Sequence, residues 1–187
     1  MDKIVIDIET KNSFRDVGPE NTQALEVSFV GVYSYEQDAY LSFFENQMDE
    51  LGKLLKKSRL VIGFAIRRFD LPVLKKYFNF DVTSLPSLDL FDDIQSGAGF
   101  RVGLDVLAHA NLGVGKTNHG LEAIEFYKSG RLEDLKNYCL NDVKITKDLY
   151  ELAKNQGYLW IPRRNNPQML KLALSYPEEK SVQAQLF

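Results

Sequence analysis

The chain has 187 residues, 44% of them hydrophobic, which is typical of one globular domain that can bury its own core. Its 23 basic and 26 acidic residues give a net charge of −3, which excludes a protein that coats nucleic acid by general positive charge. The single cysteine, Cys139, excludes an internal disulfide framework, and the longest apolar run, residues 60–66, is too short to span a membrane. We therefore expect a cytoplasmic, monomeric protein without a membrane segment.

Segments rich in β-branched and aromatic residues predict the strands of a sheet. Residues 11–26, which follow the first of these segments, are polar, contain Gly18-Pro19 and predict a loop. The second and third segments are joined by a short polar turn, which predicts an antiparallel hairpin. The last is a short strand that runs into a turn. These segments are residues 3–10, 27–34, 39–44, 60–65 and 85–93.

Apolar residues at helical spacing predict helices, and the last of them has the strongest pattern. These helices are residues 48–57, 69–78, 104–112, 121–127 and 132–153. This order of strands and helices predicts an α/β fold, a mixed five-stranded sheet with helices on both faces. We assign residues 1–157 to this domain, residues 158–174 to a C-terminal extension packed on it, and residues 175–187 to an exposed tail. Prolines in the extension argue against a long helix there.

Two acidic residues interrupt the first predicted strand, which reads Lys-Ile-Val-Ile-Asp-Ile-Glu-Thr over residues 3–10. Asp7 and Glu9 are two positions apart, so both carboxylates leave the same face of the strand and lie side by side. Like charges between apolar neighbours repel each other and lose hydration, and a divalent cation that prefers oxygen ligands would resolve the conflict. The alternative is a strand end at which Glu9 simply enters solvent.

A third acid, Asp70, follows the strand predicted at residues 60–65. Ligands gather at the carboxyl ends of strands in open α/β sheets, which makes this acid a candidate for the same site. The alternative role is in the first turn of a helix, because a carboxylate there interacts favourably with the helix dipole and Pro72 is tolerated.

The fourth acid, Asp142, belongs to the long helix predicted at residues 132–153. Tyr138 precedes it by four positions, so the two side chains project from the same side of the helix. Apolar neighbours such as Cys139 and Val143 place this pair at the border of buried surface. The alternative is an exposed acid beside a half-buried tyrosine.

These segments together resemble the motifs of the DEDD family of 3′–5′ exonucleases, the proofreading-type nucleases with a ribonuclease-H-like fold. The motifs are Asp-Ile-Glu-Thr on a first strand, Gly-Phe-x-x-x-x-Phe-Asp-x-Pro-x-Leu at a strand-to-helix junction, and Tyr-x-x-x-Asp on a late helix. Tyr138 is similar to the tyrosine of the DEDDy branch, since Asn137 occupies the position of the histidine in the other branch. Residues 104–138 further resemble the bacterial YprB-like predicted exonucleases. One departure is Ala65, where many family members carry asparagine.

The resemblance implies hydrolysis of phosphodiester bonds with two Mg²⁺ or Mn²⁺ ions held by four carboxylates. It implies that Asp7 bridges both ions, and that Glu9, Asp70 and Asp142 bind one ion directly or through water. A phenol has a pKa of about 10, so Tyr138 is a poor general base at neutral pH and we expect it to orient the attacking water. The expected substrate is single-stranded nucleic acid, with DNA favoured and RNA also open.

Basic residues near these motifs are candidates for a rim that contacts phosphates, namely Arg67, Arg68, Arg101 and Lys116. The alternative is a set of scattered, solvated charges. Lys116 belongs to Leu-Gly-Val-Gly-Lys-Thr at residues 112–117, which is similar to the end of a phosphate-binding loop. Ala110 stands where that loop needs its first glycine, and a helix precedes it rather than a strand. We therefore expect a basic loop near the substrate, not a nucleotide-binding loop.

The last five residues, Gln-Ala-Gln-Leu-Phe, resemble the peptide by which bacterial replication and repair proteins bind the β sliding clamp. In such a motif Leu186 and Phe187 would fill an apolar pocket while Gln183 hydrogen-bonds at its edge. The alternative is that the two apolar side chains pack back onto the domain. A clamp tether would favour DNA as the substrate.

Two other functions stay open from the sequence. The first is a nucleic-acid-binding module whose nuclease activity is weak or lost, although the presence of Asp7, Glu9, Asp70 and Asp142 argues against it. The second is a structure-selective endonuclease on the same fold. Both would keep the sheet and the acidic segments, so digestion and metal-binding experiments must separate them from an exonuclease.

Overall fold

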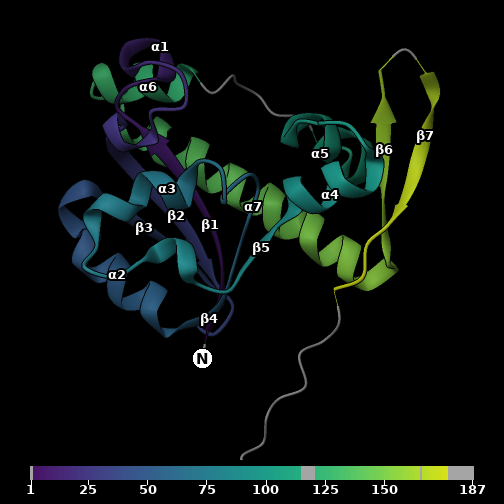
Figure 1. Ribbon diagram of the computed structural model, residues 1–187, viewed down its shortest axis with the longest axis horizontal. Helices are drawn as coiled ribbons and strands as arrows, with labels where there is room; N and C mark the ends of the chain where they lie inside the picture. The colour runs from purple at the N-terminus through teal and green to yellow at the C-terminus, as the bar shows by residue number, and fades with distance from the viewer. Residues whose placement is uncertain (1, 115–120, 165, 177–187) are drawn as a thin grey trace, which may run out of the picture.

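The computed structural model describes residues 2–114, 121–164 and 166–176 (Figure 1). Within these residues, the central sheet has five strands in the order β3-β2-β1-β4-β5. β1 pairs antiparallel with β2 and parallel with β4, so the sheet is mixed, and the predicted α/β class is confirmed. The strands are β1 (Asp2–Thr10), β2 (Val27–Ser34), β3 (Ala39–Phe44), β4 (Ser58–Gly63) and β5 (Ser87–Asp89).

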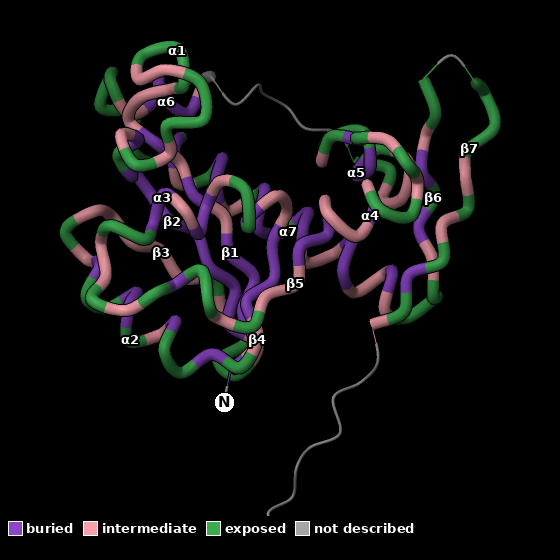
Figure 2. The backbone as a smooth tube through the Cα atoms, viewed as in Figure 1, coloured by how far each residue is buried: buried purple, intermediate pink, exposed green. Residues whose placement is uncertain are grey.

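Helices cover both faces of this sheet, and the buried residues follow β1, β2 and the facing side of α7 (Figure 2). One face packs against α2 and α3, and the other against α7 with α4 and α5 beside it. The helices of the described residues are α1 (Phe14–Val17), α2 (Met48–Lys57), α3 (Asp70–Leu74), α4 (Leu90–Ala98), α5 (Leu104–Leu112), α6 (Leu121–Lys128) and α7 (Leu132–Gln156).

Alternation along β1 divides the core into two halves. Ile4, Ile6 and Ile8 belong to the cluster under α2 and α3, whereas Val5 packs with the cluster under α7. Because side chains alternate across a strand, Asp7 shares the face of Val5 and lies on the side of α7. None of the described helices combines the length and the apolar character that a membrane span requires.

The structure corrects the predicted helix at residues 69–78. α3 ends at Leu74 and a 3₁₀ turn, Lys75–Tyr77, replaces the rest. The reason is tertiary: the Tyr77 hydroxyl accepts a hydrogen bond from the Val27 N–H at 2.9 Å and donates one to Glu45 at 3.0 Å. These bonds connect the segment to the start of β2 and to the end of β3, and they override the helical spacing.

Two predicted non-helical segments contain short helices that the sequence analysis did not expect. The predicted turn after β5 is helix α4, because the Asp89 carboxylate caps it by accepting hydrogen bonds from the N–H groups of Phe91 and Asp92. The predicted loop over residues 11–26 contains α1, which a capping box between Ser13 and Asp16 stabilises. Both helices rely on short-range caps that apolar periodicity does not reveal.

The C-terminal segment forms a two-stranded hairpin of β6 (Tyr158–Arg163) and β7 (Asn166–Ala173) that is separate from the central sheet. The sequence argued only against a long helix here and did not predict these strands. The hairpin lies beside α4 and α5 in Figure 1, and Asn111 of α5 bonds to both backbone groups of Trp160 at 2.8 Å. Leu159 and Ile161 are fully buried in the core under α7.

Candidate active site

Asp7 and Glu9 lie on β1 as predicted, on the face that α7 covers. They pair across the sheet with Gly31 and Phe29 of β2, and both side chains are half-buried. Half-burial between apolar strands lowers the hydration of two neighbouring carboxylates, which favours a cation beside them. The strand therefore carries a pair of acids that remains open on one side.

Asp70 reaches the same strand through the backbone. β4 ends at Gly63 while β1 continues, so beyond the end of β4 the Ile8 N–H has no strand partner and donates to Asp70 Oδ1 at 3.1 Å. Ile8 stands between Asp7 and Glu9 in the sequence, so this bond holds the third carboxylate at the backbone of β1 between the first two acids. Asp70 is buried, and this burial, opposed by backbone hydrogen bonds such as that from Ile8 and aided slightly by the Asp89 charge, raises its pKa to about 7.

The loop between β4 and α3 is organised by a residue that the sequence analysis missed. Asp89, at the end of β5, is completely buried, and its carboxylate accepts hydrogen bonds from the N–H groups of Ala65 at 2.8 Å and Arg67 at 3.0 Å. The same carboxylate caps α4. It therefore joins β5, α4 and the loop that delivers Asp70. The cue in the sequence was an acid directly before Leu90, where a helix N-cap is common.

A close approach at the beginning of this loop explains why β4 ends in glycine. A Cβ on Gly63 would lie 2.1 Å from Cγ2 of Ile66 and 3.0 Å from the carbonyl oxygen of Ile6. The chain thus folds back onto β1 directly after β4. Ala65 follows in the left-handed region with a φ of 64°, which brings its N–H to Asp89.

α7 delivers the last acidic residue by packing against β2 at Gly31. A Cβ on Gly31 would lie 3.1 Å from Sγ of Cys139 and 3.1 Å from Cγ2 of Val143, so the helix sits directly on the strand. The Cys139 thiol donates to the carbonyl oxygen and to Oδ2 of Asp7, each at 3.4 Å. Asp142, one helical turn later, is buried with 5% of its surface exposed. α7 therefore carries Asp142 on the same side as Cys139, the residue that contacts Asp7.

Tyr138 is held by an aromatic cluster on the same helix. Its ring contacts Phe126 of α6 edge-on, with 6.4 Å between the ring centroids, and both belong to a buried cluster with Phe29 of β2. The tyrosine is buried and projects from the same side of α7 as Asp142. Packing therefore restricts the position of the phenol beside the acids.

The donor atoms of this site suit a divalent metal ion. Within the described residues, potential ligand atoms of Asp7, Glu9 and Cys139 lie within 4.8 Å of one another, and Asp70 and Asp142 stand outside this close group. Carboxylate oxygens are the ligands that Mg²⁺ and Mn²⁺ prefer, whereas a thiol is not. Burial, followed by the charges of Asp7 and Glu9, raises the pKa of the Cys139 thiol well above its usual value. The oxygens fit the expected ions, and the sequence analysis missed the thiol.

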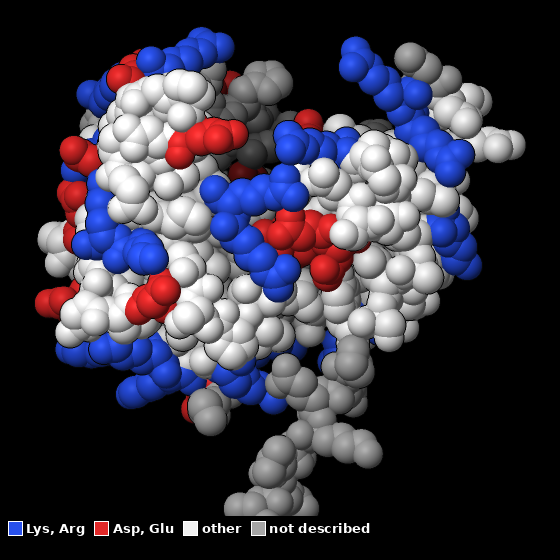
Figure 3. All heavy atoms as spheres, viewed as in Figure 1, with Lys and Arg blue, Asp and Glu red and all other residues white. Residues whose placement is uncertain are grey.

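Two arginines of the predicted basic rim, Arg67 and Arg68, already contact other residues of the protein. Arg68 forms an ion pair with Asp92 at 2.8 Å, and Arg67 hydrogen-bonds to Ser87 besides lying 3.9 Å from the same carboxylate. Figure 3 shows positive and negative side chains side by side on this face. Arg101 is exposed between α4 and α5. Lys116 and the clamp-like tail with Gln183, Leu186 and Phe187 lie outside the described residues.

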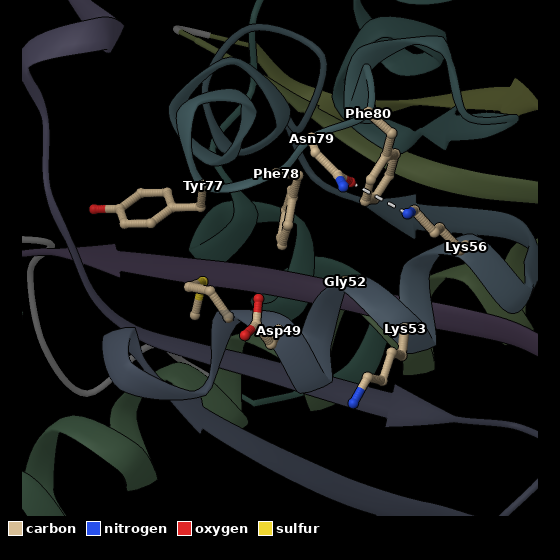
Figure 4. Close-up of a pocket in the computed structure, with 9 residues that line it drawn as sticks. Asp49, Gly52, Lys53, Lys56, Tyr77, Phe78, Asn79 and Phe80 are labelled. Atoms are coloured by element: carbon tan, nitrogen blue, oxygen red, sulfur yellow. Dashed lines mark hydrogen bonds between the residues drawn. The ribbon is translucent and has the colours of Figure 1, made fainter.

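A separate groove of about 370 Å³ lies between α2 and the segment that follows α3 (Figure 4). It is lined by stacked rings of Phe78 and Phe80 and by lysines, of which Lys56 donates to Asn79 at 3.3 Å. α2 covers the face of the sheet opposite Asp7. The groove therefore contributes nothing to the acidic site.

Comparison with known proteins identifies the superfamily and the fold. A family model of the RNase H superfamily matches residues 4–154, which include most of β1 and of α7. The chain belongs to the RNase H superfamily. No curated protein matches it by sequence. A family B DNA polymerase from the hyperthermophilic archaeon Pyrobaculum calidifontis is similar in structure, with a TM-score of 0.63 and 17% identity over 82% of this chain and 24% of the polymerase. At this identity the likeness shows a shared fold, over about a quarter of the polymerase.

Superfamily membership accounts for the sheet and for α7 but leaves the hairpin outside the matched residues, which end at 154. All four predicted carboxylates and Tyr138 lie within the matched part of this RNase H superfamily member. Asp89 and Cys139 also lie within the matched part, and their roles are inferred from the geometry of this chain.

Proposed function

We propose that this RNase H superfamily domain is a metal-dependent 3′–5′ exonuclease that hydrolyses single-stranded nucleic acid, with DNA favoured and RNA as the alternative substrate. The observation that supports the proposal is the bond from the Ile8 N–H to Asp70, because it holds a carboxylate from another segment at the β1 backbone between Asp7 and Glu9. Asp142 completes the set through α7. The direction of digestion rests on the resemblance of these motifs to DEDDy exonucleases, and we propose that the protein acts as a monomer.

Each side chain has a distinct task in this proposal. Asp7 and Glu9 present oxygens from β1, while Asp70 and Asp142 present theirs from α3 and α7, so four carboxylates would hold Mg²⁺ or Mn²⁺. Ions bound there would acidify a water molecule and offset the charge that develops on the phosphate. Asp89 holds the loop that leads to Asp70 and acts as a positioning residue.

In this proposal Tyr138 orients the attacking water molecule and does not remove its proton. An ordinary phenol has a pKa of about 10 and holds its proton at neutral pH, so we expect Tyr138 to donate or accept a hydrogen bond without serving as the base. Its contact with Phe126 restricts the ring. The hydroxyl would thus orient the water for in-line attack on the phosphorus atom.

The proposal is tested by a digestion panel with the full chain and Mg²⁺ or Mn²⁺. A 5′-labelled single strand should give a ladder of shortened products, a 3′-labelled strand should release labelled mononucleotide first, and a circular single strand should survive. The same panel in RNA ranks the two substrates. Rapid cutting of circles would replace the exonuclease with an endonuclease, and binding without digestion would leave a nucleic-acid-binding module.

Asp7→Asn provides the matched loss of function. The change removes one charge at constant volume and should lower the rate by about 10³-fold, because bound metal supplies several kcal/mol of stabilisation. Asp49→Asn makes the same change at an exposed position of α2 and should leave the rate unaltered. Excess chelator should abolish the activity of the natural chain and of Asp49→Asn. Full activity of Asp7→Asn with an intact circular-dichroism spectrum would remove the metal site from the proposal.

We also propose that the C-terminal motif with Gln183, Leu186 and Phe187 binds a bacterial β sliding clamp. The support is the sequence Gln-Ala-Gln-Leu-Phe, and the consequence is a higher local concentration at DNA for an acidic protein. Purified clamp should bind the full chain and not a chain that ends at Lys180. Equal binding of the two chains, or no binding of the full chain, would discard this partner.

A further inference from the structure

The hairpin of β6 and β7 differs in charge from the rest of the chain. Residues 157–176 contain Arg163, Arg164 and Lys171 and no acidic residue, in a protein whose net charge is −3. Both arginines and the lysine are exposed. In the view of Figure 3 the part of the surface over the hairpin shows blue side chains and no red ones. The hairpin is therefore a local cationic surface.

The outer face of the hairpin also carries aromatic rings. Trp160 pairs directly with Lys171 across the two strands, and Tyr158 lies two positions before it, so the three side chains share one face. The rings of Tyr158 and Trp160 meet edge-on with centroids 5.6 Å apart, and Lys171 Nζ lies 3.9 Å from the Tyr158 centroid. Trp160 is 38% exposed and Met169 is 48% exposed. The opposite face, with Leu159 and Ile161, is the buried one.

This exposed face is fixed in place rather than loosely attached. The Asn111 side chain donates to the carbonyl oxygen of Trp160 and accepts from its N–H, both at 2.8 Å, so α5 binds the free edge of β6 at this residue. Leu172 of β7 and Ile94 of α4 belong to the same core cluster. These contacts hold the rings in place on the hairpin, where Tyr158 is partly exposed and Trp160 keeps 38% of its surface exposed.

We propose that this outer face, defined by Tyr158, Trp160 and Lys171 together with the exposed Arg163 and Arg164 at the end of β6, is a binding surface for single-stranded nucleic acid. Unpaired bases stack on exposed aromatic rings, and basic side chains beside the rings attract the phosphates between the bases. A protein partner would not require three cations without an acid, and a duplex would hide the base faces that the rings need. The inference rests on the proposed nucleic-acid substrate and assigns to the hairpin the nucleotides that lie away from the cleaved end.

The chain contains its own probe, because Trp160 is the single tryptophan. We would titrate full-length Asp7→Asn in chelator with oligothymidylate and record tryptophan fluorescence, so that neither metal nor hydrolysis is needed. Stacking should quench the emission in a saturable manner. With three phosphate contacts, the affinity should fall with salt at a logarithmic slope of about −2, since each contact contributes about −0.7 on single strands.

Matched variants decide whether the hairpin is the site. Lys171→Gln should reduce the salt slope by about 0.7, whereas Lys53→Gln on α2 should leave it unchanged. Binding of a fluorescent oligonucleotide should weaken about tenfold in Trp160→Ala and be largely kept in Trp160→Phe, which preserves a stacking ring. Far-ultraviolet circular dichroism confirms that the variants are folded.

The outcomes separate this inference from the proposed nuclease activity. Quenching by single strands in a protein that digests nothing would support the hairpin and overturn the nuclease. Digestion without quenching would overturn the hairpin and keep the nuclease. Equal effects of Lys171→Gln and Lys53→Gln, or equal quenching by a duplex, would also overturn the hairpin as a single-strand surface.

Discussion

At the scale of single residues, one backbone N–H connects the acidic segments of the candidate site. Ile8 donates to Asp70 where β1 has run past the end of β4, so strand β1 itself positions the carboxylate that α3 carries. The placement of this acid therefore depends on backbone geometry and less on the rotamer of an exposed side chain. Asp89 in turn holds the loop that leads to Asp70, by accepting hydrogen bonds from the backbone N–H groups of Ala65 and Arg67.

The roles of Tyr138 and Asp142 can be separated by their variants. Tyr138→Phe removes only a hydroxyl and leaves all four carboxylates, so we expect a rate loss of about tenfold to a hundredfold. Asp142→Asn removes a proposed metal ligand and should cost about 10³-fold, with a higher metal requirement. Single-turnover rates at several Mg²⁺ concentrations measure both. A loss in Tyr138→Phe as large as that in Asp142→Asn would refute the orienting role.

Ala65 is a second position where one residue has a measurable energetic effect. Its φ of 64° costs a residue with a Cβ about 1 kcal/mol, whereas asparagine adopts this region readily. Ala65→Asn should therefore raise the free energy of unfolding by about 0.5–1 kcal/mol, and Ala65→Val should lower it by more than about 1 kcal/mol. Urea unfolding compares the three proteins. Identical midpoints would contradict the left-handed conformation.

At the scale of elements, the contact between α7 and β2 determines how far Asp142 stands from Asp7. Gly31 provides the space, and Gly31→Ala would push on Cys139 and Val143, each 3.1 Å from the new Cβ. We expect a loss of about 1–3 kcal/mol in stability and about tenfold in activity, because the whole helix must move.

Gly52→Ala is the control for this prediction. Its Cβ would lie 3.1 Å from Cδ1 of Phe78, an equally close contact, but on α2 at the other face of the sheet. Alanine also favours the helix by about 1 kcal/mol, so stability should change little and activity should be kept. Loss of activity in both variants would show that activity depends on the overall stability of the protein and not on the position of α7 against β2.

At the scale of the whole molecule, buried Asp70 makes stability depend on pH in the absence of metal. Its pKa is 3.8 in the unfolded reference and about 7 in the folded protein, so the folded state binds more protons between these values. Stability should therefore fall as the pH rises from about 4 to about 7 and then level off. Carboxyl groups with lowered pKa values, such as Glu45, act below this range.

Thermal unfolding in chelator between pH 5 and pH 8 tests this dependence. We expect the melting temperature to decrease with pH in the natural chain and to be nearly constant in Asp70→Asn, which cannot ionise. Added Mg²⁺ should raise the melting temperature most at pH 8, because it offsets the charge of the ionised carboxylates. A melting temperature that rises with pH in chelator would contradict the burial of Asp70 as an ionisable group.

The sequence alone was sufficient for the order of the main strands and helices and for the four carboxylates that we propose as ligands. Strand and helix periodicities are local, and β1, β2, β3, α2, α5 and α7 follow them closely. Asp7 and Glu9 were visible because two acids on one face conflict with an apolar strand. Asp70 and Asp142 were candidates from their positions, after a predicted strand and on a long helix, and the resemblance of whole motifs joined them to the pair on β1.

The tertiary structure decided what depends on partners distant in the chain. Asp89 is an ordinary acid in the sequence, and its burial follows from N–H groups more than twenty positions away. Cys139 lies beside Asp7 because Gly31 admits α7, and the cationic aromatic face of the hairpin exists because β7 brings Lys171 next to Trp160. Register and long-range hydrogen bonds form only when the chain is folded, so no local pattern records them.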